Sequence, residues 1–587
     1  MSNYFLITTA LTETWDLDKK ILFLGEWCKE NNKKSSWRNL NSRTQAYHWN
    51  DRSNLKSDYN YSKSIYETLI IELTQDLNFY HKTNNSSRYW KIILGPWLLS
   101  FMQAALERYR NIEQLKNDEN KYKTIILQID KNTMLPNTFE MYSRLLLTDT
   151  WNHFIFGEIL KQIKISEKII IKKKIFVDKE KFGNYLKPNK HSKIRKMYSF
   201  FLRFFKKKIE NEKFFISESY LGLFDEIKLN LKLSCFPKYD NFTLPENKTV
   251  NNEDRIKYIL KNFTPKNEFE KILCELIKIQ IPLSFFENFK EIKKITKNIN
   301  WPAKPKVIFT SHFLQSSIQA FYTAEKIEKF NSVLINGQHG GVYGQYLFST
   351  AQDHEIDVCN KFLSWGWQDL KSKKIIPYGV IKNISKIKYN KKNDKILLIL
   401  KSQTRYTARI NSYSGSFQMH NYFKECVKFC KKMNHFIEAN KLTVRIHHRR
   451  FWHEDSIFKN EFPNLHIDGG YKPIHKFLSD YKLVVHSYLA TGYLETLASN
   501  FPTIIFGNLH DCLLNQETLN DLKILSGAKI FHDNYESAAS FINKNYQNID
   551  EWWKSDITQK ARIVFCEKYA KKNKNKINSL IAILGAY

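Results

Sequence analysis

The chain has 587 residues, of which 42% are hydrophobic and 15% aromatic, and its formal net charge is +33. One hydrophobic core rarely supports so long a chain, so we expect two or three domains. The apolar content excludes a disordered chain, and no apolar run reaches the roughly 18 residues that a membrane-spanning helix requires. The eight cysteines form no CxxC pair, which favours reduced, buried thiols over a zinc site or a disulfide framework.

Residues 1–150 open with two strand-like runs, at 4–10 and 21–24, and continue with helical patterns rich in Trp and Tyr. Their first residues lack the basic start and long apolar run of a signal peptide, which predicts a cytoplasmic protein. Residues 151–300 are predicted to be mostly helical and are strongly basic.

From residue 301 onward, short apolar runs alternate with longer helical patterns, which is typical of parallel α/β layers. In residues 301–385 we expect a helix at 315–330 and strands at 306–310, 333–336, 362–365 and 375–378. A Lys/Asn-rich linker at 382–394 follows. In residues 395–587 we expect a helix at about 419–440 and strands at 396–400, 443–447, 465–467, 483–485, 503–506 and 529–532.

These patterns predict an α/β fold in which two Rossmann-type domains face a cleft. Residues 1–150 and 301–385 would form the N-terminal, acceptor domain, and residues 395–587 the C-terminal, donor domain. Residues 151–300 would be a largely helical, basic insertion in the N-terminal half.

The insertion carries 17 Lys and Arg against four Asp and Glu between residues 161 and 210. Its segment SKIRKMYSFFLRFFKKKIE (192–210) interleaves aromatic with basic residues. This pattern fits a helix on an anionic membrane surface, where each basic residue contributes about 1 kcal/mol. It fits equally well a linking helix whose Phe face packs into the protein. Nucleic acid is disfavoured, because no RNP, zinc-finger or helix-turn-helix signature accompanies the charge.

A glycine-rich turn, NGQHGGVYGQ from Asn336, follows the strand expected at 333–336. Glycines let the backbone bend sharply and approach a ligand closely. Within it His339 would project into the cleft, where a neutral imidazole can take a proton from an acceptor hydroxyl. Gln338, Gly340 and Gly341 would shape this cleft turn. The alternative is a turn whose histidine only forms local hydrogen bonds.

Two basic clusters follow strands of the second half. Lys401 and Arg405 come after the strand at 396–400, whereas Arg445, His447 and His448 end the strand at 443–447. Such side chains suit a diphosphate or a donor carboxylate, and surface-basic loops are the alternative. The histidines have no acidic or Cys partner at metal-ligand spacing, and no DxD motif follows a central buried strand. We therefore predict no metal and no cofactor.

The segment VHSYLATGYLETLASNFPTIIF (485–506) reads as strand, small-residue turn, helix and second strand. Such a unit points free backbone N–H groups and the positive end of a helix dipole at one spot. We expect Ser487, Thr491 and Gly492 to hold a donor phosphate there, and Glu495 to bind a ribose diol. Alternatively, Glu495 only interacts with the helix dipole, which contributes about 0.3–1 kcal/mol.

Together, ITTALTETWDLDKKILFLGEWC, SRYWKIILGPWL, INGQHGGVYG, RIHHRR and ATGYLETLASNFPTI resemble a transferase family of bacterial O-antigen and surface-polysaccharide gene clusters. The similarity spans nearly the full length. The His-Gly turn and the Ser/Thr-Glu turn also resemble two GT-B groups that use cytidine-activated donors. These are the capsular Kdo transferases and the CDP-glycerol glycerophosphotransferases. Asn500 stands where many nucleotide-sugar transferases have glycine.

The resemblance implies a metal-independent, GT-B-like glycosyltransferase of lipopolysaccharide O-antigen or capsule assembly. Its donor would be a nucleotide-sugar, favoured as a CMP-activated acidic sugar, and its acceptor a glycan or lipid-linked glycan. It would work in the cytoplasm, peripherally on the inner face of the cytoplasmic membrane. Three other functions stay open: a CDP-glycerol or ribitol-type polyol-phosphate transferase, an epimerase-type relative, and a non-enzymatic polysaccharide-assembly partner.

Overall fold

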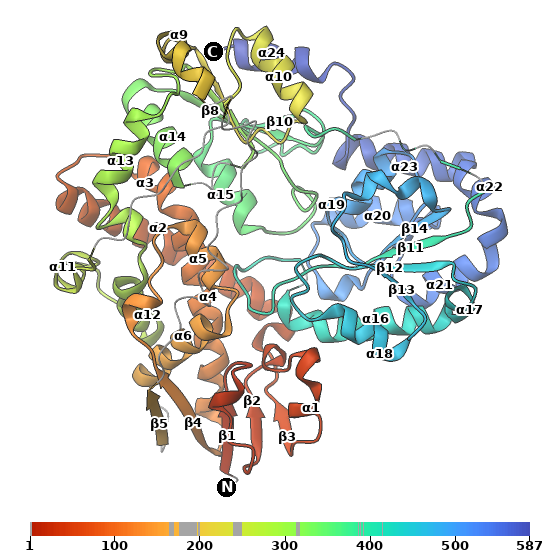
Figure 1. Cartoon of the computed structure of the whole chain (residues 1–587), viewed down its shortest axis with the longest axis horizontal. Coiled ribbons are helices and arrows are strands. Elements are labelled where there is room, and N and C mark those ends of the chain that lie inside the picture. Colours follow the sequence, from red (N-terminus) through yellow and green to blue (C-terminus); the bar gives the residue numbers. More distant parts are fainter. Residues whose placement is uncertain are drawn as a thin grey trace.

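The computed structural model describes residues 3–163, 169–174, 200–238, 249–312, 317–384, 392–413 and 415–587, together with residues 197, 387, 389 and 390. In this part of the chain, parallel strands form three sheets covered by helices (Figure 1). The predicted α/β class with parallel sheets is confirmed. The sequence predicts two sheets, whereas the structure has three.

The additional sheet belongs to the N-terminal part, at the bottom of Figure 1. Its order is β3-β2-β1-β4-β5, from β1 (Asn3–Ile7), β2 (Ile21–Phe23), β3 (Ser42–Thr44), β4 (Lys121–Gln128) and β5 (Ile169–Lys174). β4 alternates exposed and buried residues over its first half and pairs with β1 on one side and β5 on the other. The N-terminal strands are therefore a sheet of their own, not part of the sheet that residues 301–385 build.

Helices cover this sheet and connect it to the rest of the molecule. They are α1 (Lys34–Trp37), α2 (Arg52–His81), α3 (Ser87–Ile93), α4 (Gly95–Glu113), α5 (Phe139–Leu145) and α6 (Asp149–Gln162). Nearly every residue of α4 is buried, on all faces of the helix. A helix that is buried all round lies in the core of a large protein, so α4 is the central helix of the N-terminal part.

The middle sheet has the sequential order β10-β9-β8-β7-β6. Its strands are β6 (Phe214–Ile216), β7 (Val307–Thr310), β8 (Val333–Gly337), β9 (Lys361–Ser364) and β10 (Ile375–Pro377). Its helices, with those of the preceding segment, are α9 (Lys206–Glu210), α10 (Leu223–Lys232), α11 (Asn252–Tyr258), α12 (Glu268–Gln280), α13 (Phe289–Asn298), α14 (Ser317–Phe330) and α15 (Thr350–Val358). The region predicted as a helical insertion thus supplies one strand, β6, to this sheet and another, β5, to the N-terminal sheet.

The C-terminal sheet has the order β13-β12-β11-β14-β15-β16. Its strands are β11 (Ile396–Ile399), β12 (Leu442–Arg445), β13 (His466–Asp468), β14 (Leu483–His486), β15 (Thr503–Phe506) and β16 (Phe531–His532), so each predicted strand is confirmed. Counted from β11, this is the 3-2-1-4-5-6 order of the Rossmann fold, which reverses between the first and fourth strands. A crevice at that reversal, between β11 and β14, is the expected ligand site.

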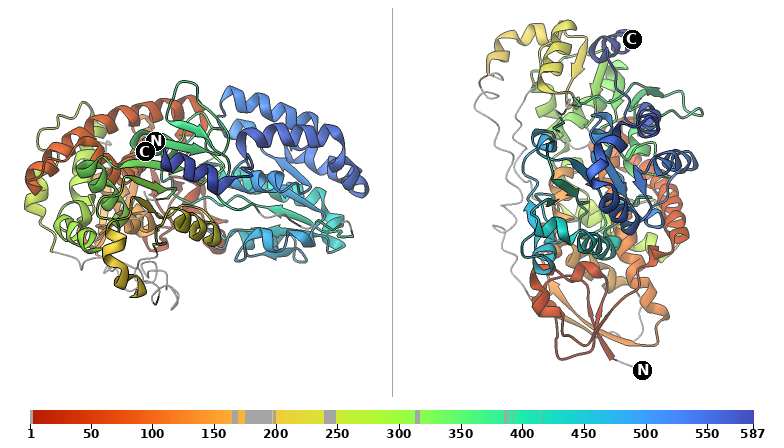
Figure 2. Two further views of the ribbon diagram at one scale, coloured as in Figure 1. Left: turned by 90° about the horizontal axis from the view of Figure 1, so that it is seen from above. Right: turned by 90° about the vertical axis from the view of Figure 1, so that its right-hand side faces the viewer.

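Helices flank this sheet, and the last of them returns to the middle part (Figures 1 and 2). They are α16 (Met419–Lys432), α17 (Asn434–Glu438), α18 (Glu454–Glu461), α19 (Thr491–Ala498), α20 (Gln516–Gly527), α21 (Tyr535–Asn545), α22 (Ile549–Lys554), α23 (Asp556–Tyr569) and α24 (Lys576–Gly585). Leu580 and Leu584 of α24 are fully buried in one cluster with Phe309 of β7 and Ile335 of β8. This packing fixes the C-terminal end of the chain to the middle sheet.

Within the described ranges, no helix combines the length and the apolar composition needed to cross a membrane. All eight cysteines are free thiols, and seven of them are buried.

The basic segment at 161–210 is described only in part, since residues 164–168, 175–196, 198 and 199 lie outside the described residues. In the described remainder, the side chains of Phe200, Phe201 and Phe204 are 60%, 51% and 76% exposed. Phe205 turns inward, and its ring centroid lies 5.2 Å from that of Phe236. Part of the predicted Phe face therefore packs into the protein, and part faces solvent.

A long loop of the C-terminal sheet, residues 400–417 (the crossing loop), reaches over to the N-terminal part. Arg405 forms ion pairs with Asp149 at the start of α6 and with Glu30. It also donates a hydrogen bond to the backbone oxygen of Trp27 at 2.9 Å. Because the Arg405 side chain is 9% exposed, this is a buried ion pair.

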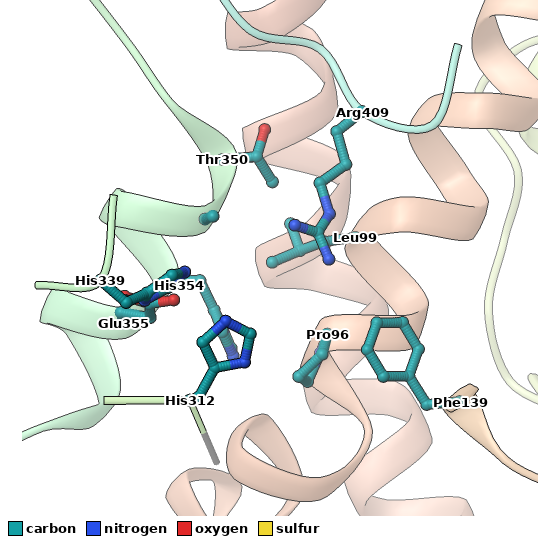
Figure 3. Close-up of a pocket in the computed structure, with 10 residues that line it drawn as sticks. Pro96, Leu99, Phe139, His312, His339, Thr350, His354, Glu355 and Arg409 are labelled. Atoms are coloured by element: carbon teal, nitrogen blue, oxygen red, sulfur yellow. The ribbon is translucent and has the colours of Figure 1, made fainter. Parts of the chain in front are cut away.

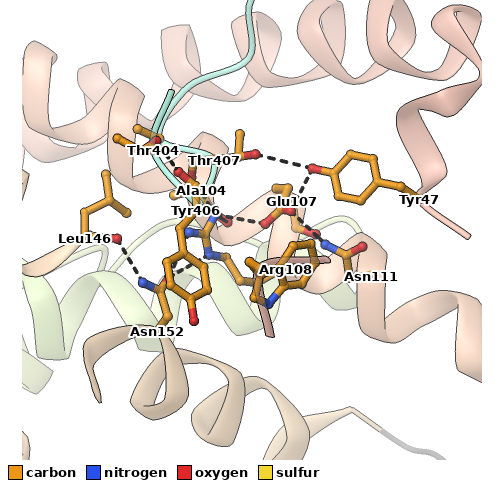
Figure 4. Close-up of polar contacts among 12 residues, drawn as sticks. Tyr47, Ala104, Glu107, Arg108, Asn111, Leu146, Asn152, Thr404, Tyr406 and Thr407 are labelled. Atoms are coloured by element: carbon orange, nitrogen blue, oxygen red, sulfur yellow. Dashed lines mark hydrogen bonds and ion pairs between the residues drawn. The ribbon is translucent and has the colours of Figure 1, made fainter. Parts of the chain in front are cut away.

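The same loop is bound by α4 through a fully buried arginine. Arg108 donates to the backbone oxygen of Thr407 at 2.6 Å and to Asn152 of α6 at 2.8 Å, and it pairs with Glu107 at 2.8 Å (Figure 4). Tyr47 donates to Glu107 at 2.7 Å. Each charge in this network has an opposite charge or several hydrogen bonds, as burial requires.

Replacing Arg405 with Met should lower the free energy of unfolding by about 3 kcal/mol, because Asp149 would stay buried without its counter-ion. Urea titration followed by Trp fluorescence measures the loss. The double variant Arg405→Met/Asp149→Asn should recover most of it. Arg43→Met is the matched control, because Arg43 is 47% exposed in its pair with Asp118 and should change stability by about 1 kcal/mol or less. Equal losses for Arg405→Met and Arg43→Met would contradict the buried ion pair.

Candidate functional site

A cavity of about 240 Å³, the switch-point cavity, lies where the C-terminal sheet reverses its strand order. Its lining includes residues 401–403 after β11, residues 487–490 after β14, and residues 507–509, 511 and 512 after β15. Val342 and Tyr346 line it from the middle part. Open α/β sheets bind their ligands in this crevice outside the carboxyl ends of the strands.

The switch-point cavity contains a buried lysine. Lys401 is 8% exposed, and burial lowers the pKa of its ammonium group to about 8. Its Nζ lies 5.1 Å from the centroid of the Tyr422 ring. Asp511 and Glu425 share the cavity, and burial raises the pKa of both carboxyl groups. The cavity therefore offers a cation for a phosphate and carboxyl oxygens for hydroxyl groups.

Ser487 and Ala490 place the backbone leading into α19 along the same cavity. The Ser487 hydroxyl donates to the backbone oxygen of Ile399 at 2.8 Å and lies 2.6 Å from the Tyr422 hydroxyl. No side chain caps the N-terminus of α19 at Ala490. The first turn of a helix has free N–H groups and a partial positive charge, which suit an anion.

The glycine-rich turn of the middle part contacts the start of α19 directly. Gly341 donates its N–H to Thr491 Oγ1 at 2.9 Å, and Tyr346 donates to the backbone oxygen of Leu489 at 2.7 Å. A Cβ on Gly341 would lie 2.7 Å from Thr491 Cα and 2.8 Å from the Ala490 oxygen. The two predicted turns thus meet, and glycine is required because two backbones touch there.

His339 lines a second, smaller cavity of about 40 Å³, the His339 pocket. Its Nε2 lies 3.3 Å from the Tyr343 hydroxyl, which donates to Glu355 at 3.1 Å. Burial lowers the pKa of His339 to about 3 and raises that of Glu355 to about 8. At neutral pH the imidazole and the carboxyl group are therefore both uncharged.

The hydrogen bonds of Tyr343 allow a tautomer of His339 in which Nδ1 can act as a base. When Tyr343 donates to Glu355, the Tyr343 oxygen accepts the Nε2 proton of His339. Nδ1 then carries the lone pair. It makes no hydrogen bond and lies 3.9 Å from Glu355 Oε2. A neutral histidine in this tautomer can accept a proton from a substrate hydroxyl.

Two side chains, Lys382 and Tyr220, lie between Glu495 and His339 and connect them through successive contacts. Glu495 forms an ion pair with Lys382, which follows β10. The Lys382 ammonium group lies 5.7 Å from the Tyr220 ring centroid, and that centroid is 6.4 Å from the His339 ring. The structure thus brings the predicted ribose-binding carboxylate toward the middle part, where an ammonium group already holds it.

Gln338 and Gly492 have local structural roles in the described chain. Gln338 is fully buried, accepts hydrogen bonds from Trp365 N and Trp367 Nε1 at 2.8 Å, and thereby fixes the turn before His339. Gly492 lies against His486, whose Cε1 would be 3.0 Å from an added Cβ.

The remaining predicted cations lie elsewhere. Arg405 binds the N-terminal part, as described above. Arg445 forms an ion pair with Asp468 at the end of β13, and His447 and His448 follow it with ring centroids 4.2 Å apart. Burial and the neighbouring His448 lower the pKa of His447 to about 4. All four residues stand outside the lining of the switch-point cavity.

Several polar residues of the His339 pocket carry no sequence signal. Figure 3 shows His312, His339, His354 and Glu355 on one side of the pocket and Phe139 and Pro96 on the other, with Arg409 reaching between them. His354 and Glu355 lie on α15, which reads as an ordinary polar helix. Arg409 follows Arg405 by four residues, and the local sequence does not show that their side chains point to different parts of the structure.

Residues 4–584 match the LIC12162 family of transferases, so the chain belongs to this transferase family. No curated protein matches the chain.

Similarity to solved structures is low. TarM matches at 14% identity over 47% of this chain and 54% of its own, with a TM-score of 0.30. The wall teichoic acid polymerase TagF matches at 10% identity over 52% of this chain and 84% of its own, with a TM-score of 0.28. MurG of Acinetobacter baumannii matches at 10% identity over 51% and 77%, with a TM-score of 0.29. The chain spans about half the length of TarM.

Gly341→Ala should destabilise the protein by about 1–3 kcal/mol, because the added methyl group would overlap the backbone of Thr491 and Ala490. Differential scanning fluorimetry measures the change in melting temperature. Gly340→Ala is the matched control, since its Cβ would meet no atom closer than 3.5 Å and should change stability by about 0.5 kcal/mol or less. A melting temperature unchanged by Gly341→Ala would contradict the direct contact between the two turns.

Proposed function

We propose that this transferase is a glycosyltransferase that binds a nucleotide-activated sugar in the switch-point cavity and transfers the sugar at His339. The observation that carries the proposal is the contact between Gly341 and Thr491. It joins a cavity suited to a nucleotide, with a buried cation and a free helix N-terminus, to a turn that presents a neutral histidine. Membership of a transferase family agrees with this chemistry.

In the proposed reaction, Lys401 and the N-terminus of α19 hold the phosphate of the donor. Tyr422 and Tyr346 offer aromatic surface to the base, and Asp511 or Glu425 accepts hydrogen bonds from the ribose. The acceptor oxygen attacks the anomeric carbon, and the bond from that carbon to the phosphate oxygen breaks. The phosphate leaves with the electron pair, and His339 Nδ1 takes the proton of the acceptor hydroxyl.

A CMP-activated acidic sugar is our preferred donor, and a lipopolysaccharide O-antigen or capsule glycan, free or lipid-linked, is our preferred acceptor. The donor follows from the resemblance of the His-Gly and Ser/Thr-Glu turns to enzymes with cytidine-activated donors. The acceptor follows from the nearly full-length resemblance to a transferase family of O-antigen and surface-polysaccharide gene clusters. We propose no metal, because positively charged side chains and a helix terminus are available to balance the leaving phosphate. The reaction would take place in the cytoplasm.

A thermal-shift screen with CMP, CDP, UDP and GDP tests the donor site, because a bound ligand raises stability by RT ln(1 + [L]/Kd). One cytidine nucleotide should give the largest shift. Its Kd should rise above pH 8 by up to about tenfold per pH unit, because Lys401 loses its proton there and the anion stabilises the protonated form. In Lys401→Met the affinity should fall and this pH dependence should disappear.

His339→Gln separates binding from transfer. It should keep the nucleotide-induced shift and lose transfer from the matching nucleotide-sugar. No shift with any nucleotide would contradict the proposal and favour a non-enzymatic assembly partner. Transfer of glycerol phosphate from CDP-glycerol would identify a polyol-phosphate transferase, and release of a modified free nucleotide-sugar an epimerase-type enzyme.

We further propose that the enzyme contacts an anionic membrane surface through Phe200, Phe201 and Phe204 with the adjacent Lys206, Lys207 and Lys208. Exposed aromatic side chains next to lysines fit the boundary between lipid head groups and acyl chains. In a flotation assay, vesicles with phosphatidylglycerol should carry the protein, and pure phosphatidylcholine vesicles should not. Phe200→Ser/Phe204→Ser should reduce flotation, whereas Leu370→Ser, at a residue 96% exposed, should not. Equal flotation with both vesicles would contradict the contact.

A further inference from the structure

The His339 pocket contains a cation without a counter-ion. Arg409 of the crossing loop lines the pocket (Figure 3). Among the described residues, no carboxylate lies within 4.0 Å of its guanidinium group, and it makes no hydrogen bond. Arg108 and Arg405 of the same region each have a carboxylate partner. Arg409 thus differs from its neighbours in pointing its charge at open space.

The groups that face Arg409 leave its charge unbalanced. Burial lowers the pKa of His312, and it lowers that of His354 to about 4. His339 is neutral for the same reason, and Glu355, whose pKa burial raises to about 8, keeps its proton at neutral pH. The pocket therefore carries a net positive charge from Arg409.

His354 supplies a second polar atom that has no partner. Its Nε2 is buried without a hydrogen bond, and the residue is 5% exposed. The ring packs against α4, because a Cβ on Gly95 would lie 2.6 Å from its Cε1 and 3.1 Å from its Nε2. A buried polar atom without a partner is unfavourable, so a ligand oxygen that accepts a hydrogen bond from this nitrogen would relieve that penalty.

The size of the pocket limits what can enter. About 40 Å³ accommodates a group of a few heavy atoms and not a whole sugar. Arg409 also lines a neighbouring cavity of about 260 Å³, together with Ser100, Thr407 and Tyr413. A ligand whose body fills the larger cavity could place one small substituent beside Arg409.

We propose that Arg409, with His354 and His312, binds the carboxylate of an acidic sugar. The atom of that sugar that reacts in the transfer lies beside His339. A carboxylate matches the single charge of Arg409 and the planar, two-pronged geometry of its guanidinium group. The proposal rests on the proposed function, since it names the residues that would select an acidic sugar at the same site. In this proposal the substrate carboxylate is the counter-ion of Arg409, which the described residues do not provide.

Calorimetric titration of the full chain with N-acetylneuraminate, D-glucuronate, glucose and glucose 6-phosphate tests the subsite. Wild-type protein should bind at least one of the two carboxylate sugars tenfold or more tightly than glucose. Arg409→Gln should lose that preference, and Arg409→Lys should restore part of it, because an ammonium group supplies the charge without the bidentate geometry. Lys63→Gln, which removes a positive charge from an exposed position of α2, should leave the preference unchanged.

The melting temperature distinguishes a binding role from a structural one. Removal of an unpaired charge should leave it unchanged or raise it, whereas loss of a structural contact would lower it and contradict the proposal. Absence of any carboxylate preference in the wild type would also overturn the subsite, and so would tighter, Arg409-dependent binding of glucose 6-phosphate. If, in either of these two outcomes, a cytidine nucleotide still raises the melting temperature as the thermal-shift screen expects, the proposed function stands without the carboxylate subsite. If carboxylate binding depends on Arg409 but no nucleotide binds, the subsite stands and the donor assignment fails.

Discussion

The crossing loop, residues 400–417, is the constraint on which both cavities depend. It leaves β11 at Lys401 inside the switch-point cavity, is bound by Asp149 and Arg108 of the N-terminal part, and reaches the His339 pocket with Arg409. A loop of this length costs considerable entropy to order, roughly 1–2 kcal/mol for each residue. The buried ion pairs and the backbone hydrogen bonds to α4 offset that cost. Because one loop lines both cavities, the contacts of Asp149 and Arg108 help to hold residues of both cavities in place.

The N-terminal sheet and its helices bind the crossing loop. Its strand order also reverses, between β1 and β4, and such a reversal commonly holds a ligand. Here the space is used by the protein itself. His153 lies 3.3 Å from Thr8 after β1 and accepts the N–H of Leu127 of β4 at 3.1 Å. Asp149 accepts the N–H of Ala10 at 3.1 Å and pairs with Arg405.

The sequence predicts the C-terminal sheet almost residue by residue, because its strands are short apolar runs between strong turn signals. It also predicts that the turns around His339 and Thr491 face one cleft, because each follows a strand of one of two Rossmann-type domains that lie across that cleft. It does not predict β4, where Lys alternates with apolar residues in KYKTIILQ. Nor does it separate Arg405 from Arg409, since the partner of Arg405 lies 256 residues away. Glu355 reads as a surface carboxylate until packing buries it.

Burial determines which side chains of the His339 pocket carry a charge. In a region with few water molecules, imidazole stays neutral and a carboxyl group keeps its proton, because each avoids a charge that it cannot solvate. The same low polarity strengthens every interaction with a charge that does remain. Arg409 is such a charge, and Tyr343 lies between His339 and Glu355, which line the same pocket. A pocket of neutral acid–base groups beside one cation is suited to hold an anionic substituent still while a nearby hydroxyl loses its proton.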